Sequence, residues 1–312
     1  MKAMSKFFLI VSGVLVGIGI VICIIASVMA KSQGIQLFQK KTDGKYIYTV
    51  DLENTDITKI SIDATNADIT VYTGQEKEYI EFINFDDNYY SVSTTNMVVS
   101  FNEYVDLPSL FSFWDPSYSF KGMRSILKLV KHVDGPKEIN IYLSDRRDMK
   151  IFDFTLESGE IIVENMSSDT DYTFSLDSGR IEMTNINTES NLKINANSCS
   201  VDIEKCSFGY FNGDIATANV KGNIGGVHSF VLSSKSGNID LDIAFDSELS
   251  NTNIMTSGTV SVNGEFYQGT YNNISDDIEI TEEFATAKIT GDDLNVNFDF
   301  ENKTAQTPED TQ

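Results

Sequence analysis

Two ten-residue stretches near the middle of the chain decide its fold. They are Phe154-Thr-Leu-Glu-Ser-Gly-Glu-Ile-Ile-Val163 and Phe174-Ser-Leu-Asp-Ser-Gly-Arg-Ile-Glu-Met183, and they begin 20 residues apart. Each alternates apolar and polar residues and reaches a Ser-Gly pair, and in the second stretch the alternation resumes after that pair with Ile181 and Met183. Alternation with a period of two is typical of a β-strand with one buried face. Its return at a fixed interval indicates a repeat architecture.

The serine of each Ser-Gly pair marks a position that recurs along the chain. Clear copies of this marker follow at Ser198, Thr217, Ser236 and Ser257, and more degenerate ones at Asn66 and Thr286. The residue after every marker is small, and the third residue after it is always β-branched and apolar: Ile69, Ile161, Ile181, Val201, Val220, Ile239, Val260 and Ile289. Such regularity predicts one structural unit of about 20 residues, repeated many times.

The apolar positions predict how one unit is shaped and how units assemble. Residues two before the marker, such as Leu156 and Leu176, are mostly apolar, so the alternation changes phase across the marker. The chain must therefore bend there, where a residue without a large side chain fits. A single unit cannot bury its apolar face alone, so units should stack at about 4.8 Å with parallel strands. We therefore predict an all-β fold, a β-solenoid of stacked β-repeats.

The predicted stacking of units leads to specific expectations for the cysteines. Cys199 should stack with Gly179 and Ala218 at the bend, and Cys206 should be a buried core thiol because it falls where other units place Met166 and Ile186. The third cysteine, Cys23, lies in the apolar N-terminal run. We expect all three to be free, because neither a CxxC motif nor a Cys/His cluster is present.

The N-terminus predicts a single transmembrane α-helix. Residues 7–30 form 24 consecutive residues without a charge, enough to cross a bilayer as a helix. A short tail, residues 1–6, would lie in the cytoplasm and the rest of the chain outside the cell. A cleaved signal peptide ending at Val28-Met29-Ala30 is the rival interpretation. Gly13 and Gly17 form a GxxxG motif, a candidate face for helix dimerisation, although lipid-facing glycines without a partner are the simpler alternative.

An insertion at residues 75–137 interrupts the repeat. Its alternating segments 79–83 and 97–101 predict an antiparallel pair of strands. Residues 107–137 carry aromatic and basic residues, and Met123, Ile126, Leu127 and Val130 have the spacing of an amphipathic helix. This helix could cover an end of the solenoid. Alternatively it could contact a membrane surface or a partner through Trp114, Lys121, Arg124, Lys128 and Lys131.

These features divide the chain into consecutive segments. The predicted order is a cytoplasmic tail, a transmembrane helix, a juxtamembrane segment with the first β-unit, the insertion, the regular β-repeat array and a polar, disordered tail: residues 1–6, 7–30, 31–74, 75–137, 138–300 and 301–312.

Charge and motif content limit the function. The net charge is −23, from 46 acidic and 23 basic residues, which disfavours nucleic acid and anionic lipid as partners. His132 and His228 are lone histidines, and no nucleophile elbow, P-loop or dedicated calcium loop occurs. We therefore expect no catalytic residue, no metal and no cofactor.

The segments Glu138-Ile-Asn-Ile-Tyr-Leu-Ser144 and Met149 to Val163 resemble the bacterial adhesin-like β-repeat family, a domain of unknown function. The resemblance covers about residues 45–300. It implies a β-solenoid on the bacterial envelope, often behind one membrane helix and sometimes linked to envelope stress, and it implies no catalytic residue. The basic, aromatic segment 107–137 departs from the family pattern.

Three functions follow as hypotheses. The preferred one is a non-enzymatic, membrane-anchored envelope protein displayed outside the cell for binding or scaffolding of an unknown envelope ligand. The second is a regulatory partner of another membrane protein, acting through residues 107–137. The third is a polysaccharide-active β-solenoid enzyme, which would need grouped carboxylates along one groove.

Overall fold

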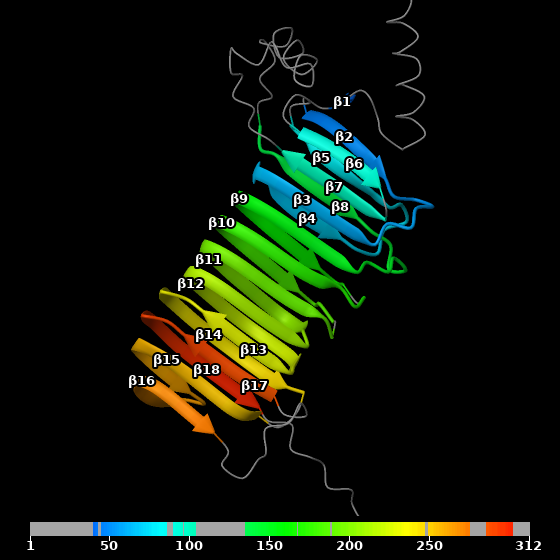
Figure 1. The fold of residues 1–312 in the computed structure, drawn as a ribbon. Coiled ribbons are helices and arrows are strands. Elements are labelled where there is room, and N and C mark those ends of the chain that lie inside the picture. The colour runs from blue at the N-terminus through cyan, green and yellow to red at the C-terminus, as the bar shows by residue number, and fades with distance from the viewer. Residues whose placement is uncertain are drawn as a thin grey trace, which may run out of the picture.

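A computed structural model describes residues 40–42, 45–85, 90–95, 97–103, 135–166, 168–187, 189–246, 249–274 and 285–301. These residues form an all-β structure whose strands belong to one continuous hydrogen-bonded set (Figure 1). The strands are β1 (Lys40–Thr42), β2 (Lys45–Asp51), β3 (Lys59–Asn66), β4 (Asp68–Tyr72), β5 (Tyr79–Ile83), β6 (Tyr90–Thr95), β7 (Val98–Glu103), β8 (Glu138–Tyr142), β9 (Ile151–Glu164), β10 (Asp171–Thr184), β11 (Asn191–Ser207), β12 (Tyr210–Val227), β13 (Ser229–Ser233), β14 (Ser236–Phe245), β15 (Leu249–Val262), β16 (Glu265–Ile274), β17 (Ala285–Thr290) and β18 (Asp293–Glu301).

The four long strands β9 to β12 stack in parallel, one above the next. Phe154 pairs with Phe174, which pairs with Ile194, and equivalent residues of successive repeats stay opposite each other along the strands. This register confirms the parallel stacking of units about 20 residues apart. Each strand passes through the bend without a break in its secondary structure, so one coil of the stack is a single bent strand followed by a turn.

The bend column contains small residues because neighbouring coils approach each other closely there. A Cβ atom at Gly179, whose φ is +147°, would lie 2.0 Å from the carbonyl oxygen of Gly159 in the preceding coil. Further along the same column, Cys199 pairs with Gly179 on one side and with Ala218 on the other, as predicted. Cys199 and Ala218 are both buried.

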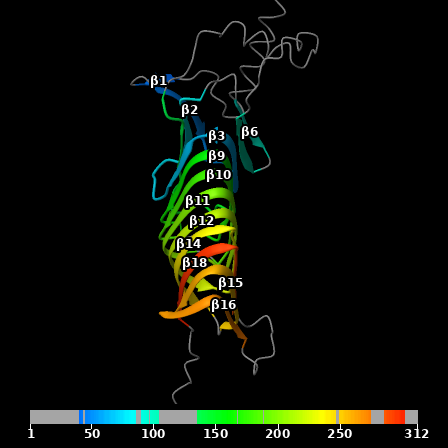
Figure 2. The same ribbon diagram turned by 90° about the vertical axis from the view of Figure 1, so that its left-hand side faces the viewer.

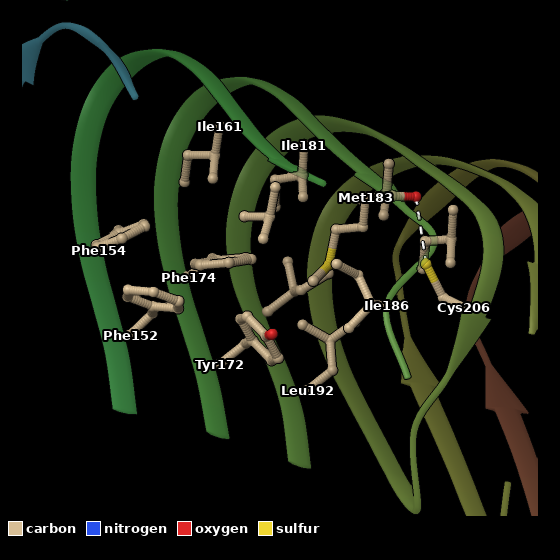
Figure 3. Packing of buried hydrophobic residues seen from close by; sticks show 14 of the residues in the cluster. Phe152, Phe154, Ile161, Tyr172, Phe174, Ile181, Met183, Ile186, Leu192 and Cys206 are labelled. Atoms are coloured by element: carbon tan, nitrogen blue, oxygen red, sulfur yellow. Dashed lines mark hydrogen bonds between the residues drawn. The ribbon is translucent and has the colours of Figure 1, made fainter. Parts of the chain in front are cut away.

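The core lies inside the bent strands and continues from coil to coil. Figure 3 shows Phe152 and Phe154 beside Tyr172 and Phe174 of the adjacent coil, and the rings of Phe154 and Phe174 stack with centroids 5.6 Å apart. Cys206 is buried in this core and donates from Sγ to the carbonyl oxygen of Met183 at 3.3 Å. The prediction of a core thiol at this position is confirmed.

At the C-terminal end, the order of the coils differs from their order in the chain. Strands β17 and β18 lie between the β13–β14 coil and β15, and all of these strands are parallel (Figures 1 and 2). The prediction of a marker at Thr286 is wrong, because Thr286 pairs with Ser229 ahead of the bend. The bend of this last coil lies at Asp293, which pairs with the true marker Ser236. The hairpin β15–β16 then forms the next, antiparallel layer.

The other end of the stack repeats this arrangement. The coil made by β3 and β4 lies between β9 and a split coil made by β7 and β8. Antiparallel strands follow, with β6 beside β7, and β5 between β8 and β2. The predicted pair of 79–83 with 97–101 is therefore wrong: both segments are strands, but β5 and β7 pair with other partners. Residues 138–142 likewise join this end coil instead of opening the regular array.

Several sequence predictions lie outside the described residues. These are the N-terminal helix with Gly13 and Gly17, the C-terminal tail beyond residue 301, and the helix of segment 107–137 with Trp114, Lys121, Arg124, Lys128 and Lys131. Within the part of the chain that the structure describes, no helix has the length and apolar character needed to span a bilayer.

Candidate functional site

A shallow groove follows the stack beside the bend of successive coils. It encloses about 990 Å³ and collects residues from nine different strands and their connections. We call it the axial groove, because it crosses the strands and follows the direction of stacking. Its lining residues are Asp63, Ala64, Thr65, Glu103, Thr155, Leu156, Glu157, Ser175, Leu176, Asp177, Asn195, Ala196, Asn197, Asp214, Ala216, Ser233, Ser234, Lys235, Met255, Thr290, Gly291 and Asp292.

One column of strand residues forms a polar row along the groove. We call it the ladder row; its members pair directly from coil to coil and are Asp63, Thr155, Ser175, Asn195, Asp214, Ser233 and Thr290. All seven are exposed or half-buried. At the usual strand spacing of about 4.8 Å, seven strands in succession span about 29 Å. The row therefore offers a small polar group at each step along the groove.

A second row lies nearer the bend, two residues further along each coil. It consists of Thr65, Glu157, Asp177, Asn197, Ala216, Lys235 and Asp292. Between the two rows lie Ala64, Leu156, Leu176 and Ala196, of which the first three are buried and Ala196 is half-buried. The alternation of the strand explains this cross-section, because residues on either side of an inward-facing position point to the opposite face. The surface of the groove is therefore formed mainly by the two outward-facing rows, with the strand backbone between them.

Met255 departs from the expected pattern at one end of the groove. It stands two residues before a marker, where an apolar residue should be buried, but it is 50% exposed. Its strand, β15, follows the inserted C-terminal coil and pairs with the antiparallel strand β16. A methionine on this surface adds a flexible apolar wall to the groove.

The electrostatics of the groove are acidic. Asp63, Glu157, Asp177, Asp214 and Asp292 line it, and none of them forms an ion pair with another residue of the described ranges. Glu103 instead accepts hydrogen bonds from Thr65 and forms an ion pair with Lys137. Lys235 is the basic residue in the lining. Acids in such number repel anions along the whole groove.

The opposite half of each coil carries a different polar surface. Arg180 contacts Glu160, Glu182 and Asp202 at 2.9–3.4 Å, and Lys221 contacts Asp202 at 2.9 Å. Asp240 and Asp242 are exposed there. These side chains form ion pairs and hydrogen bonds with one another across coils, for example Asn297 with Asp240 at 2.7 Å. Such contacts between exposed groups are those of a solvated face.

Within the described residues, no cluster of three or more potential metal-ligating side chains occurs. His228 lies 3.4 Å from Asp246 through Nδ1 and packs edge-on against Tyr210. Burial raises the pKa of the Cys199 thiol to about 12 and that of Cys206 to about 11. Both thiols therefore stay protonated near neutral pH, which makes them poor nucleophiles and metal ligands.

Sequence reasoning did not find the axial groove. Its only signal was a polar residue three positions before most markers, such as Thr155, Ser175 and Asn195. That alternation is also required of any strand with one solvated face, so it does not distinguish a groove from an ordinary surface.

Similarity to known proteins is found only among solved structures. No family model matches the sequence, and no curated protein matches it. Among solved structures, a putative cell adhesion protein from Clostridium sporogenes has 14% identity and a TM-score of 0.33, covering 82% of this chain and 99% of that one. A putative adhesin from Bacteroides fragilis has 14% identity and a TM-score of 0.42, covering 85% of this chain and all of that one. Similarity this distant carries no argument about function.

Proposed function

We propose that this chain is a non-enzymatic binding protein of the cell envelope, which holds an extended ligand along its axial groove. The observation that carries the proposal is the continuity of the groove over successive coils with the ladder row in register. A groove that crosses many equivalent coils presents the same kind of contact repeatedly, which suits a long ligand better than a compact one.

The cellular setting is part of the same proposal. The apolar run at residues 7–30 anchors the chain in the membrane, and the β-stack stands outside the cell. A surface with a net charge of −23 over the chain suits a soluble exterior domain that resists nonspecific adhesion to anionic polymers.

The location is tested by protease shaving of intact cells that produce the chain. We expect peptides from residues 46–301 to be released from intact cells while the N-terminal peptide stays with the membrane. Protection of the β-stack until the cells are lysed would overturn the exterior placement.

Binding in the groove is tested with the full-length chain in detergent and the insoluble wall polymers of the producing cells. Ser233→Trp places a bulky ring in the groove at an exposed position of β13, and it should reduce co-sedimentation with the polymers. Ala244→Trp adds the same ring at an exposed position of β14 outside the groove lining, and it should bind as the wild type does. Equal binding by all three proteins would show that the groove is not the binding site.

A further inference from the structure

The side chains of the ladder row differ in one respect from other polar rows of the stack. On the opposite half of the coils, neighbouring side chains bond to each other: Asn219 donates to Ser200 at 3.4 Å, Asn295 to Asn238 at 3.2 Å and Thr259 to Asn295 at 2.8 Å. The side chains of the ladder row make no hydrogen bond with another described residue. Their hydroxyl, amide and carboxyl groups therefore stay available to a ligand.

The ladder row also offers hydrogen-bond donors as well as acceptors. Thr155, Ser175 and Asn195 occupy three consecutive steps, and each can both donate and accept. Their side chains are short, so they lose little conformational entropy when a ligand holds them. A partner rich in hydroxyl groups, which also donate and accept, is the complement of such a row.

The cross-section of the groove adds a second criterion. The ladder row and the row nearer the bend both face outward, whereas Leu156 and Leu176 between them are buried in the core. A sugar ring has C–H groups on its faces and hydroxyl groups around its edge. A chain of such rings can place its hydroxyl edges against both polar rows, with a ring face over the narrow strip of backbone between them.

Backbone geometry disfavours an extended peptide in the same place. A peptide that adds to a sheet needs a free strand edge, where unpaired N–H and C=O groups receive its backbone. Beneath the axial groove, the strands β9 to β12 are paired on both sides. The ligand must therefore be recognised through side chains alone.

Combining these criteria, we infer that the axial groove binds a linear, unbranched glycan without acidic groups. This inference rests on the proposed function and names its ligand class. The carboxylates of the groove exclude acidic glycans, because five of them have no basic partner among the described residues. The equal spacing of the ladder row requires a linear chain, since a branch would leave the groove.

The test uses three soluble hexamers: chitohexaose, which is neutral, hexagalacturonate, which is acidic, and hexalysine. Each is titrated by calorimetry into the full-length chain in detergent, and hydrogen exchange is followed at residues 155–157, 175–177 and 195–197. We expect chitohexaose to bind, to slow exchange in these segments and to bind at least ten-fold more tightly than chitobiose, because a longer chain contacts more steps of the row. Hexagalacturonate should not bind.

Matched variants locate the contact. Asn195→Ala removes a ladder-row amide and should weaken chitohexaose binding about five-fold, the loss expected for one hydrogen bond. Asn219→Ala removes an equivalent amide on the opposite half of the coil and should leave the affinity unchanged.

The outcomes separate this inference from the proposed function. If hexalysine protects the groove while chitohexaose does not, the ligand is a cationic peptide; the glycan assignment fails and the groove remains a binding site. Preferential binding of hexagalacturonate would also overturn the ligand class. If no hexamer binds and Ser233→Trp sediments with wall polymers as the wild type does, the proposed function itself fails.

Discussion

The side chain of Asn185 donates a hydrogen bond from Nδ2 to Oδ1 of Asn165, 2.8 Å away in the preceding coil. Both residues have left-handed backbone conformations, with φ values of +55° and +56°, a region that asparagine tolerates better than most residues. In the next coil, Lys205 occupies the equivalent turn position, and its φ is +53°. Lys205 therefore adopts the strained left-handed conformation, but its side chain does not continue the hydrogen bonding between Asn165 and Asn185.

We predict that Lys205→Asn stabilises the protein by about 0.5–1.5 kcal/mol, because it relieves left-handed strain and adds one hydrogen bond to Asn185. The ion pair lost with Glu204 is highly exposed and should contribute little. The midpoint of urea unfolding should rise. Lys205→Gln removes the same charge without the preference for this backbone region, and it should give no gain. Equal midpoints for the two variants would contradict the explanation.

A substitution in the bend column is predicted to destabilise the protein instead. Gly179→Ala should destabilise the protein by roughly 2–4 kcal/mol, because the new Cβ would meet the carbonyl oxygen of Gly159 and the φ of +147° disfavours any side chain. Gly264→Ala is the matched control: its φ is also positive, at +77°, but nothing lies within 4 Å of the added Cβ. It should cost only about 1 kcal/mol. Similar losses in urea midpoint for both would show that crowding between coils is unimportant.

The regular part of the stack could be predicted from the sequence because its information is local and repeated. Phe154 and Phe174 occupy the same place in consecutive repeats, and a period of 20 residues leaves one register that buries both. The same reasoning placed Cys199 at the bend and Cys206 in the core.

The ends of the stack could not be predicted in this way. An open strand edge accepts any strand of suitable pattern, so the sequence does not say that β17 and β18 return to lie between β14 and β15. Thr286-Ala-Lys-Ile289 imitates a bend because it has a small residue and an isoleucine at the right offsets. Its actual place, ahead of the bend, depends on distant partners such as Ser229. The groove depends in the same way on residues from many coils.

The inserted C-terminal coil leads to a truncation experiment. Ending the chain after residue 284 removes β17 and β18, which supply the parallel neighbours of the β15–β16 hairpin. The hairpin should then detach, since an isolated two-stranded hairpin is marginally stable in water. We expect a clear fall in the thermal midpoint and rapid proteolysis within residues 249–274. Ending the chain after Glu301 removes only the polar tail predicted to be disordered, and it should change neither measurement. Resistance of the hairpin in the shorter chain would show that it docks without the inserted coil.

The buried thiols predict how stability responds to alkaline pH. Burial raises the pKa of Cys199 to about 12, above the value of 9.0 for an unperturbed thiol. Because the folded state holds this proton more tightly than the unfolded state, the stabilisation is complete below pH 9 and is lost as the pH rises towards 12. Tyrosines titrate in part of this range, since burial also raises the pKa of Tyr48 to about 12. A comparison with Cys199→Ala isolates the thiol, and alanine already occupies the same column at residue 218.

We expect the unfolding free energy of the wild type to fall more steeply than that of Cys199→Ala between pH 9 and pH 11, as measured by urea unfolding at several pH values. The native wild type should also resist alkylation at pH 8.5 and react once it is unfolded in urea, because the thiol is both protonated and covered. Parallel pH profiles for the two proteins, or rapid alkylation of Cys199 in the native state, would show that the bend column opens to solvent and that the coils are not packed there as closely as the contacts of Gly179 indicate.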